Sequence, residues 1–247
     1  MAPQKKSPSV SHRSRLDLAA EIIETCKRMN ALGLNQGTAG NISARLDDGH
    51  FLVTPSGVPY DDMRPEDVPV MDLAGHWYGK RRPSVEWRFH RDILKARSDA
   101  TIVLHTHSMF STVLACLRLT IPAFHYMVAI AGGDTIRCAS YATFGTQELS
   151  DNALKALEGR RACLLANHGL ICLGTSLDKA LGLATEVETL AAMYIRVRQA
   201  GTPRLLDKAE MARVLELFRT YGTPQFPDTD LRQIGESWGS GRQANAS

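Results

Sequence analysis

The sequence predicts a single-domain α/β protein in which amphipathic helices alternate with short apolar strands. Residues 16–32, 147–157 and 176–197 repeat apolar side chains at the spacing of a helix that buries one face. Residues 101–107 and 161–173 are short apolar runs that end at polar or glycine residues, as buried strands do. A length of 247 residues with 44% hydrophobic and 22% charged residues fits one globular domain.

Charge, cysteine content and hydropathy limit the classes of protein that the chain can be. The formal net charge is +3, and the first fifteen residues hold four basic side chains and no acid. The rest is close to neutral, so we expect no nucleic-acid partner. The five cysteines are scattered without a CxxC pair, which is typical of reduced thiols in a cytoplasmic protein. Because no apolar run reaches the roughly 18 residues of a membrane span, we expect no membrane partner.

The two ends of the chain have the composition of flexible tails. Residues 1–14 are basic and lack the apolar stretch of a secretory signal, although a transit peptide is an alternative interpretation. Residues 224–247 are dominated by Pro, Gly, Asp, Ser and Asn, which cannot build a packed core. We therefore place the folded domain at residues 15–223.

The elements of the N-terminal third begin with a helix over residues 16–32, which Gly33 ends. The next stretch, residues 35–43, has no apolar period and is rich in small residues. Its backbone N–H groups can wrap an anion, but loops of this composition also simply turn the chain. Residues 51–57 then predict a short strand followed by a polar turn, and residues 68–78 predict a hairpin.

A second helix is expected through residues 85–97, with Ser84 as its N-cap. A helix N-terminus beside a hydroxyl favours phosphate, because unpaired N–H groups and the macrodipole attract negative charge. Glu86 in the first turn is either a surface acid that complements the dipole or a functional carboxylate. His90 shares an apolar helical stripe, which favours a packed histidine over a ligand.

Two histidines one residue apart end the strand at residues 101–107. On a strand, positions i and i+2 point to the same face with Cα atoms roughly 6.5 Å apart. The rings of His105 and His107 can therefore reach one ion at Zn–N distances of about 2.0 to 2.1 Å, although a structural pair fits the pattern equally well. A later buried strand, residues 161–169, ends in His168 beside a glycine, and residues 170–173 form its antiparallel partner.

These strand ends predict a metal site. Three imidazoles and the carboxylate of Glu86 suit Zn²⁺, with Mn²⁺, Fe²⁺ or Co²⁺ as alternatives. A site of this composition keeps or can free a coordination position, whereas closed structural zinc sites favour Cys. The donor set therefore favours a catalytic metal. The remaining elements are helices over residues 108–119 and 208–221 and a strand or irregular segment over residues 121–130.

Eight motifs together resemble the class II aldolase/adducin family. They are Asn-Gln-Gly-Thr-Ala-Gly-Asn-Ile-Ser (35–43), Pro-Ser-Val-Glu-Trp-Arg-Phe-His (83–90), His-Thr-His (105–107), Ile-Pro-Ala-Phe-His-Tyr-Met (121–127), Ala-Gly-Gly (131–133), Tyr-Ala-Thr-Phe-Gly-Thr (141–146), Asn-His-Gly (167–169) and Arg-Thr-Tyr-Gly (219–222). Within the family the chain is most similar to the aldolases that cleave L-fuculose 1-phosphate. The resemblance implies a three-layer α/β/α fold with a mainly antiparallel central sheet. It also implies a cyclic homotetramer with active sites at subunit boundaries.

The resemblance implies a role for each residue of the site. His105, His107 and His168 would bind zinc, and Glu86 would be both a fourth ligand and the catalytic acid/base. The phosphate of a small sugar substrate would lie against Gly40, Asn41, Ser56, Gly57 and Ser84. Phe144 would line the aldehyde end, Tyr126 of the neighbouring subunit would donate a proton to the leaving aldehyde, and Tyr221 would close over the site.

The implied reaction is reversible cleavage of a ketose 1-phosphate to dihydroxyacetone phosphate and a short aldehyde. Breaking the C3–C4 bond leaves an enediolate whose negative charge needs a Lewis acid, and Glu86 would move the proton. One departure is Val85, where the L-fuculose 1-phosphate enzymes have serine; a hydrogen bond to a charged group is worth about 1.5 to 3 kcal/mol. The departure keeps open 5-methylthioribulose 1-phosphate and 5-deoxyribulose 1-phosphate as substrates. Epimerase, dehydratase and decarboxylase relatives and a non-catalytic adducin-like domain are further alternatives.

Overall fold

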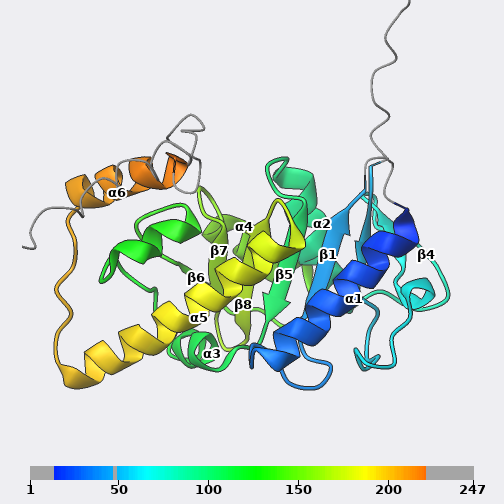
Figure 1. Cartoon of the computed structure of the whole chain (residues 1–247), viewed down its shortest axis with the longest axis horizontal. Coiled ribbons are helices and arrows are strands. Elements are labelled where there is room, and N and C mark those ends of the chain that lie inside the picture. Colours follow the sequence, from blue (N-terminus) through cyan, green and yellow to red (C-terminus); the bar gives the residue numbers. More distant parts are fainter. Residues whose placement is uncertain (1–13, 47–48, 221–247) are drawn as a thin grey trace, which may run out of the picture.

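A computed structural model of the chain describes residues 14–46 and 49–220, and it is organised around one eight-stranded sheet (Figure 1). The strand order is β4-β3-β2-β1-β5-β8-β7-β6. The strands are β1 (Asn41–Arg45), β2 (His50–Val53), β3 (Val70–Asp72), β4 (Trp77–Tyr78), β5 (Ile102–Thr106), β6 (Cys138–Ala139), β7 (Ala162–Leu165) and β8 (Gly169–Gly174). Neighbouring strands of this sheet are antiparallel except β6 and β7, which are parallel. The sheet is therefore mixed, not purely antiparallel.

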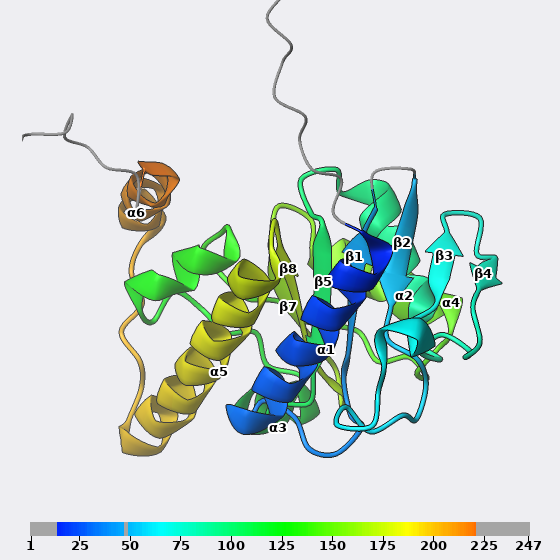
Figure 2. The ribbon, with the colours of Figure 1, turned by 45° about the vertical axis from the view of Figure 1, so that its right-hand side comes forward.

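Helices cover both faces of the sheet and complete three layers (Figures 1 and 2). The helices are α1 (Arg15–Ala31), α2 (Trp87–Ala96), α3 (Met109–Cys116), α4 (Gln147–Ala156), α5 (Leu177–Ala200) and α6 (Lys208–Thr220), with short 3-10 helices η1 (Pro65–Asp67) and η2 (Tyr126–Ala131). Alternate residues of β5 enter different cores: Leu104 packs with α1, α3 and α5, and Val103 packs with α2 and α4. This alternation is the pleat of a strand buried on both faces. By the same alternation His105 faces the α2 layer.

The structure corrects the expected start of the second helix. α2 begins at Trp87, and Ser84 is not its N-cap. The hydroxyl of Ser84 instead accepts the backbone N–H of Glu86 at 3.3 Å, while its carbonyl accepts that of Trp87 at 3.1 Å. This turn is joined to the end of β2, because Ser84 donates its own N–H to the carbonyl of Thr54, the residue after that strand. Glu86 is therefore placed at the N-cap position, at the inner end of α2.

Other boundaries agree with the sequence or differ slightly. α1 starts at Arg15, one residue before the expected start, because the hydroxyl of Ser14 caps it by accepting the N–H of Asp17 at 3.1 Å. The segment expected as strand or irregular structure instead contains η2. α6 packs on η2 at one end of the molecule, apart from the three layers (Figure 2). Tyr221 and the expected tails, apart from Ser14, lie outside the described residues.

None of the helices within residues 14–46 and 49–220 is both long enough and apolar enough to cross a bilayer.

Candidate metal and catalytic site

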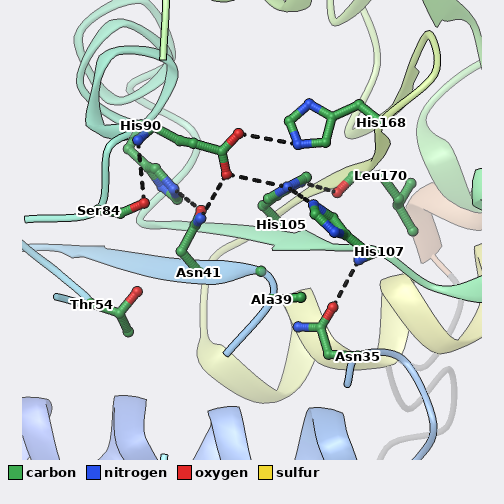
Figure 3. Close-up of polar contacts among 12 residues, drawn as sticks. Asn35, Ala39, Asn41, Thr54, Ser84, His90, His105, His107, His168 and Leu170 are labelled. Carbon is green, nitrogen blue, oxygen red and sulfur yellow. Dashed lines mark hydrogen bonds and ion pairs between the residues drawn. The ribbon is translucent and has the colours of Figure 1, made fainter. Parts of the chain in front are cut away.

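Three imidazoles meet where β5 ends and β8 begins. Figure 3 shows the rings of His105, His107 and His168 pointing toward one another. Their centroids are 4.8 Å apart for His105 and His107, 4.8 Å for His105 and His168, and 4.9 Å for His107 and His168. One nitrogen from each ring lies within 4.8 Å of the others. The structure thus brings together the three histidines that the sequence singled out.

A tight turn before β8 brings His168 to the other two histidines. Asn167 has a left-handed φ of 55°, and Gly169 follows as the first residue of β8. A Cβ atom at Gly169 would lie 2.3 Å from the carbonyl oxygen of Thr106, so only glycine allows β8 to begin this close to the end of β5. The antiparallel pairing of Thr106 with Leu170 then fixes the position of His168.

His105 and His107 have the uncharged form that a metal ligand needs. Nδ1 of His105 donates to the carbonyl oxygen of Leu170 at 2.9 Å, which leaves the lone pair on Nε2, 3.0 Å from Nε2 of His107. Burial lowers the pKa of His105 to about 3 despite the nearby Glu86 carboxylate. Burial also lowers the pKa of His107, and the neighbouring His168 adds to this effect. Three converging imidazoles are a ready cation site.

Glu86 supplies an oxygen to the same cluster. It is 6% exposed, so it is not the surface acid that the sequence left as one interpretation. Its Oε2 accepts from Nδ2 of Asn41 at 2.8 Å and lies 3.4 Å from Nε2 of His105, and its Oε1 lies 3.1 Å from Nε2 of His168. Burial alone would raise the pKa of this carboxyl, but His105, His168 and Asn41 outweigh burial and lower it.

One atom of Glu86 shows that the donor set fits a cation. Oε1 is buried, and its 3.1 Å contact with Nε2 of His168 does not have the geometry of a hydrogen bond, so among the described residues this oxygen has no hydrogen-bond donor. A buried carboxylate oxygen without a donor is costly unless a cation or a ligand completes it. Together with the three imidazoles, it forms the mixed nitrogen and oxygen set that suits Zn²⁺ and related divalent ions.

A pocket of about 460 Å³ opens onto the cluster. Its lining includes Glu86, His107 and His168. It also includes every residue that the resemblance assigned to the substrate phosphate or the aldehyde end: Gly40, Asn41, Ser56, Gly57, Ser84 and Phe144. The glycine-rich loop (residues 35–40), the turn after β2 and the turn before α2 therefore line one cavity. This common location is a fact of the fold, whereas the roles of these residues stay predictions.

The glycine-rich loop is held against the histidine cluster by contacts that the sequence did not reveal. The backbone N–H of His107 donates to Oδ1 of Asn35 at 2.8 Å, and the hydroxyl of Tyr60 donates to the carbonyls of Ala39 and Gly40 at 2.9 and 3.0 Å. Gly40 has a φ of +75°, and a Cβ atom there would lie 2.1 Å from Nδ2 of Asn35. Of these residues, only Tyr60 lay outside the motifs quoted above.

Of the two tyrosines with a predicted role, the structure describes only Tyr126. Tyr126 is 51% exposed at the start of η2 and lines a separate pocket of about 180 Å³, so the single chain does not bring it to the histidines. The prediction that it acts in a neighbouring subunit therefore stays a prediction. Tyr221 lies outside the described residues. Tyr141 also lines the 460 Å³ pocket, although the sequence gave no reason of its own to assign it a role. It lies in the same motif as Phe144, and this was the one sequence feature that could have indicated its place in the site.

Comparison with known proteins agrees with this geometry. Residues 20–195 match the family model of the Class II Aldolase and Adducin N-terminal domain. The chain is 56% identical over 209 residues to a 5-methylthioribulose-1-phosphate/5-deoxyribulose-1-phosphate aldolase of Rhodospirillum rubrum, a match that spans 85% of this chain and 94% of that protein. It is 48% identical over 209 residues to the L-fuculose phosphate aldolase of Escherichia coli, with 84% and 97% covered. A solved L-fuculose 1-phosphate aldolase superposes with a TM-score of 0.81 at 40% identity, covering 85% of this chain and 99% of that one. The chain therefore belongs to the class II aldolase and adducin family.

Proposed function

We propose that the chain is a metal-dependent aldolase that reversibly cleaves a ketose 1-phosphate to dihydroxyacetone phosphate and a short aldehyde. The observation that carries the proposal is a single pocket that contains both a cation site and a polar wall. The cation site is formed by Glu86 and the three histidines, and the polar wall includes Asn41, Ser56 and Ser84. A phosphorylated sugar needs both of these features at once.

The cation site would hold Zn²⁺, with Mn²⁺, Fe²⁺ or Co²⁺ as alternatives, through His105, His107, His168 and Glu86. When bound, such an ion supplies a Lewis acid for the negative charge that develops on the triose half as the C3–C4 bond breaks. The family membership and the three converging imidazoles support this assignment.

Glu86 would be the acid/base that moves the proton of the triose carbon. It is a buried carboxylate at the pocket wall, and it keeps one oxygen without a hydrogen-bond donor among the described residues. A base must be ionised and within reach of the proton it takes. The interactions with His105 and His168 lower its pKa and so keep it ionised.

The phosphate would lie against the polar residues of the pocket. Ser56, Ser84 and Asn41 line the pocket, together with Gly40 and Gly57. Gly57 has a φ of +69°, a conformation that glycine adopts without strain. Neutral donors and backbone N–H groups in such a turn bind phosphate without a fixed positive charge.

For the aldehyde half, we propose 5-methylthioribulose 1-phosphate or 5-deoxyribulose 1-phosphate ahead of L-fuculose 1-phosphate. The relative named for the first two is 56% identical and the one named for the third is 48% identical. The exposed side chains at the pocket edge are also apolar or aromatic: Val85, Tyr141 and Phe144. Such a surface favours a methyl or methylthio group over a hydroxyl-bearing aldehyde.

We also propose that copies of the chain form a cyclic homotetramer in which Tyr126 donates a proton in the neighbour's site and Tyr221 closes over that site. Exposure of Tyr126 supports this, as does a cavity of about 600 Å³ that shares His107 with the cation site. The cavity is lined by exposed Met109, Val113 and Leu117 of α3 and its C-cap. Head-to-tail contact between two different surfaces closes a ring when the rotation permits.

The test is release of dihydroxyacetone phosphate in a coupled assay, with and without a chelator, from each of the three ketose 1-phosphates. We expect chelator-sensitive release, restored by Zn²⁺, and the highest kcat/KM for the 5-methylthio or 5-deoxy substrate. Higher kcat/KM for L-fuculose 1-phosphate would reverse the substrate order. No triose from any of them would contradict the aldolase and leave the epimerase, dehydratase and decarboxylase reactions.

A further inference from the structure

Behind Glu86 lies a buried row of hydrogen-bonded side chains, which runs through Asn41 and His90 to Ser43 and leads away from the pocket. Oδ1 of Asn41 lies 2.5 Å from Nε2 of His90 (Figure 3). Nδ1 of His90 lies 2.7 Å from the hydroxyl of Ser43. Asn41 and Ser43 are two residues apart on β1 and so share a face, while His90 reaches them from α2. Ser43 and His90 are 0% exposed, so no solvent competes for these groups.

The direction of each hydrogen bond between these side chains follows from the ionised carboxylate of Glu86. Ionised Glu86 only accepts, so Asn41 must turn its Nδ2 toward Oε2. Oδ1 of Asn41 then faces His90, which must carry its proton on Nε2. In the neutral ring Nδ1 is an acceptor, and the hydroxyl of Ser43 donates a hydrogen bond to it. Burial, which lowers the pKa of His90 to about 3, agrees with a neutral ring.

We infer that His90, oriented by Ser43, is a positioning residue that fixes the amide of Asn41 with its nitrogen toward Glu86. The inference rests on the proposed function in assigning Glu86 as ligand and base. Without the Nε2–H donor, the amide can rotate and present its oxygen to the carboxylate, which repels it. Glu86 would then leave the orientation in which its Oε1 is directed at the histidine cluster. His90 thus acts on the site without touching the metal or the substrate.

The first experiment compares His90→Gln with His90→Leu in protein loaded with Co²⁺. Glutamine offers an N–H near the place of Nε2, whereas leucine has a similar volume and no donor. Removing groups that orient metal ligands typically costs about 10- to 100-fold in metal affinity or activity, and we expect a loss of this size for His90→Leu. The visible absorption of Co²⁺, which reports its ligand geometry, should change with it. His90→Gln should recover most of both.

Ser43→Ala is the second variant, with Ser150→Ala as its matched control. Ser150 is an equally buried serine whose hydroxyl donates to Asp92 at 2.7 Å, outside the site. We expect Ser43→Ala to weaken Co²⁺ binding and Ser150→Ala to leave the Co²⁺ spectrum unchanged. Because Ser43 acts through His90, its effect should vanish in a His90→Leu background, which a double-mutant cycle measures.

A third readout needs neither metal nor substrate. In metal-free protein with ¹⁵N-labelled histidine, the ring signal that His90→Gln removes should show the Nε2–H tautomer at pH 7. An Nδ1–H tautomer would overturn the inference. So would equal losses in His90→Gln and His90→Leu, or a folded His90→Leu protein with wild-type Co²⁺ affinity and spectrum. If the wild-type protein released no triose at all, the aldolase proposal would fail while the Co²⁺ and ¹⁵N results still decided the role of His90.

Discussion

The floor and the rim of the same pocket are built in different ways. The floor consists of Glu86, His107 and His168, with His105 buried directly beneath them. Hydrogen bonds of the chain itself hold it: Leu170 fixes the tautomer of His105, and Asn41 fixes one oxygen of Glu86. The rim consists of Val85, Tyr141 and Phe144, and it is open, with Phe144 63% exposed. One chain therefore suffices to position the proposed cation ligands, whereas by our proposal the substrate and a neighbouring copy would complete the rim.

Removing one ligand from the floor should have the largest effect. We expect His107→Ala to lose both bound metal and triose release, because two imidazoles and one carboxylate bind a divalent ion far more weakly than the full set. His107 is exposed, so the variant should still fold. Metal per chain and triose release measure the effect. His76→Ala, which removes an exposed histidine from the β3–β4 hairpin, is the control. A variant that kept wild-type metal content would show that His107 is not a ligand.

The second-largest effect is expected from a substitution that changes the charge of the floor and keeps its shape. Glu86→Gln keeps an oxygen that can accept from Asn41, so we expect it to retain most of the metal. It cannot take up a proton, so turnover should fall by about 10²- to 10⁴-fold. Metal content and kcat, measured on the same sample, separate the two effects. Near-normal turnover would contradict the role of Glu86 as acid/base.

Tyr126→Phe tests what a second copy of the chain contributes beyond the floor of the pocket. The phenol oxygen is lost, but Tyr126 is remote from the cation site within one chain, so metal content should not change. We expect slower cleavage of the ketose phosphate, by about 10²-fold, the lower end for a general acid. Exchange of the α-proton of dihydroxyacetone phosphate should slow much less, because that step needs Glu86 and no aldehyde.

Coexpression of the Tyr126→Phe and His107→Ala chains extends this test. If Tyr126 acts across a subunit boundary, mixed oligomers contain some sites with both wild-type residues and regain activity that neither variant has alone. Equal slowing of cleavage and proton exchange, or no recovery in the mixture, would contradict the assigned role.

The floor was easier to predict from the sequence than its surroundings. His105 and His107 followed from the two-residue period of a strand, and His168 from the end of another buried strand. The burial of Glu86 did not follow, because the local pattern favoured a helix from residue 85 and the turn at Ser84 depends on Thr54, thirty residues earlier in the chain. Side-chain contacts between distant segments leave no local period in the sequence.

The same limit applies to the fold. The pairing of β7 with β8 was predictable, because the two strands are adjacent in the sequence and a short turn joins them. The parallel pairing of β6 with β7 was not predicted, since α4 separates them and β6 is only two residues long. The contact of Tyr60 with the glycine-rich loop is likewise a product of the fold, and Tyr60 lies in no motif.

The smallest expected effect is at the rim. Val85 is 50% exposed, so Val85→Ser should change the free energy of unfolding by no more than about 0.5 kcal/mol. It replaces an apolar surface by a hydroxyl, which should lower the preference for 5-methylthioribulose 1-phosphate over L-fuculose 1-phosphate by about tenfold or less, or about 1.4 kcal/mol. The ratio of the two kcat/KM values measures this, and Val85→Ala shows what loss of the isopropyl group does alone. If both ratios stayed at the wild-type value, Val85 would have no part in selecting the aldehyde, and Tyr141 and Phe144 would be the rim residues to test for it.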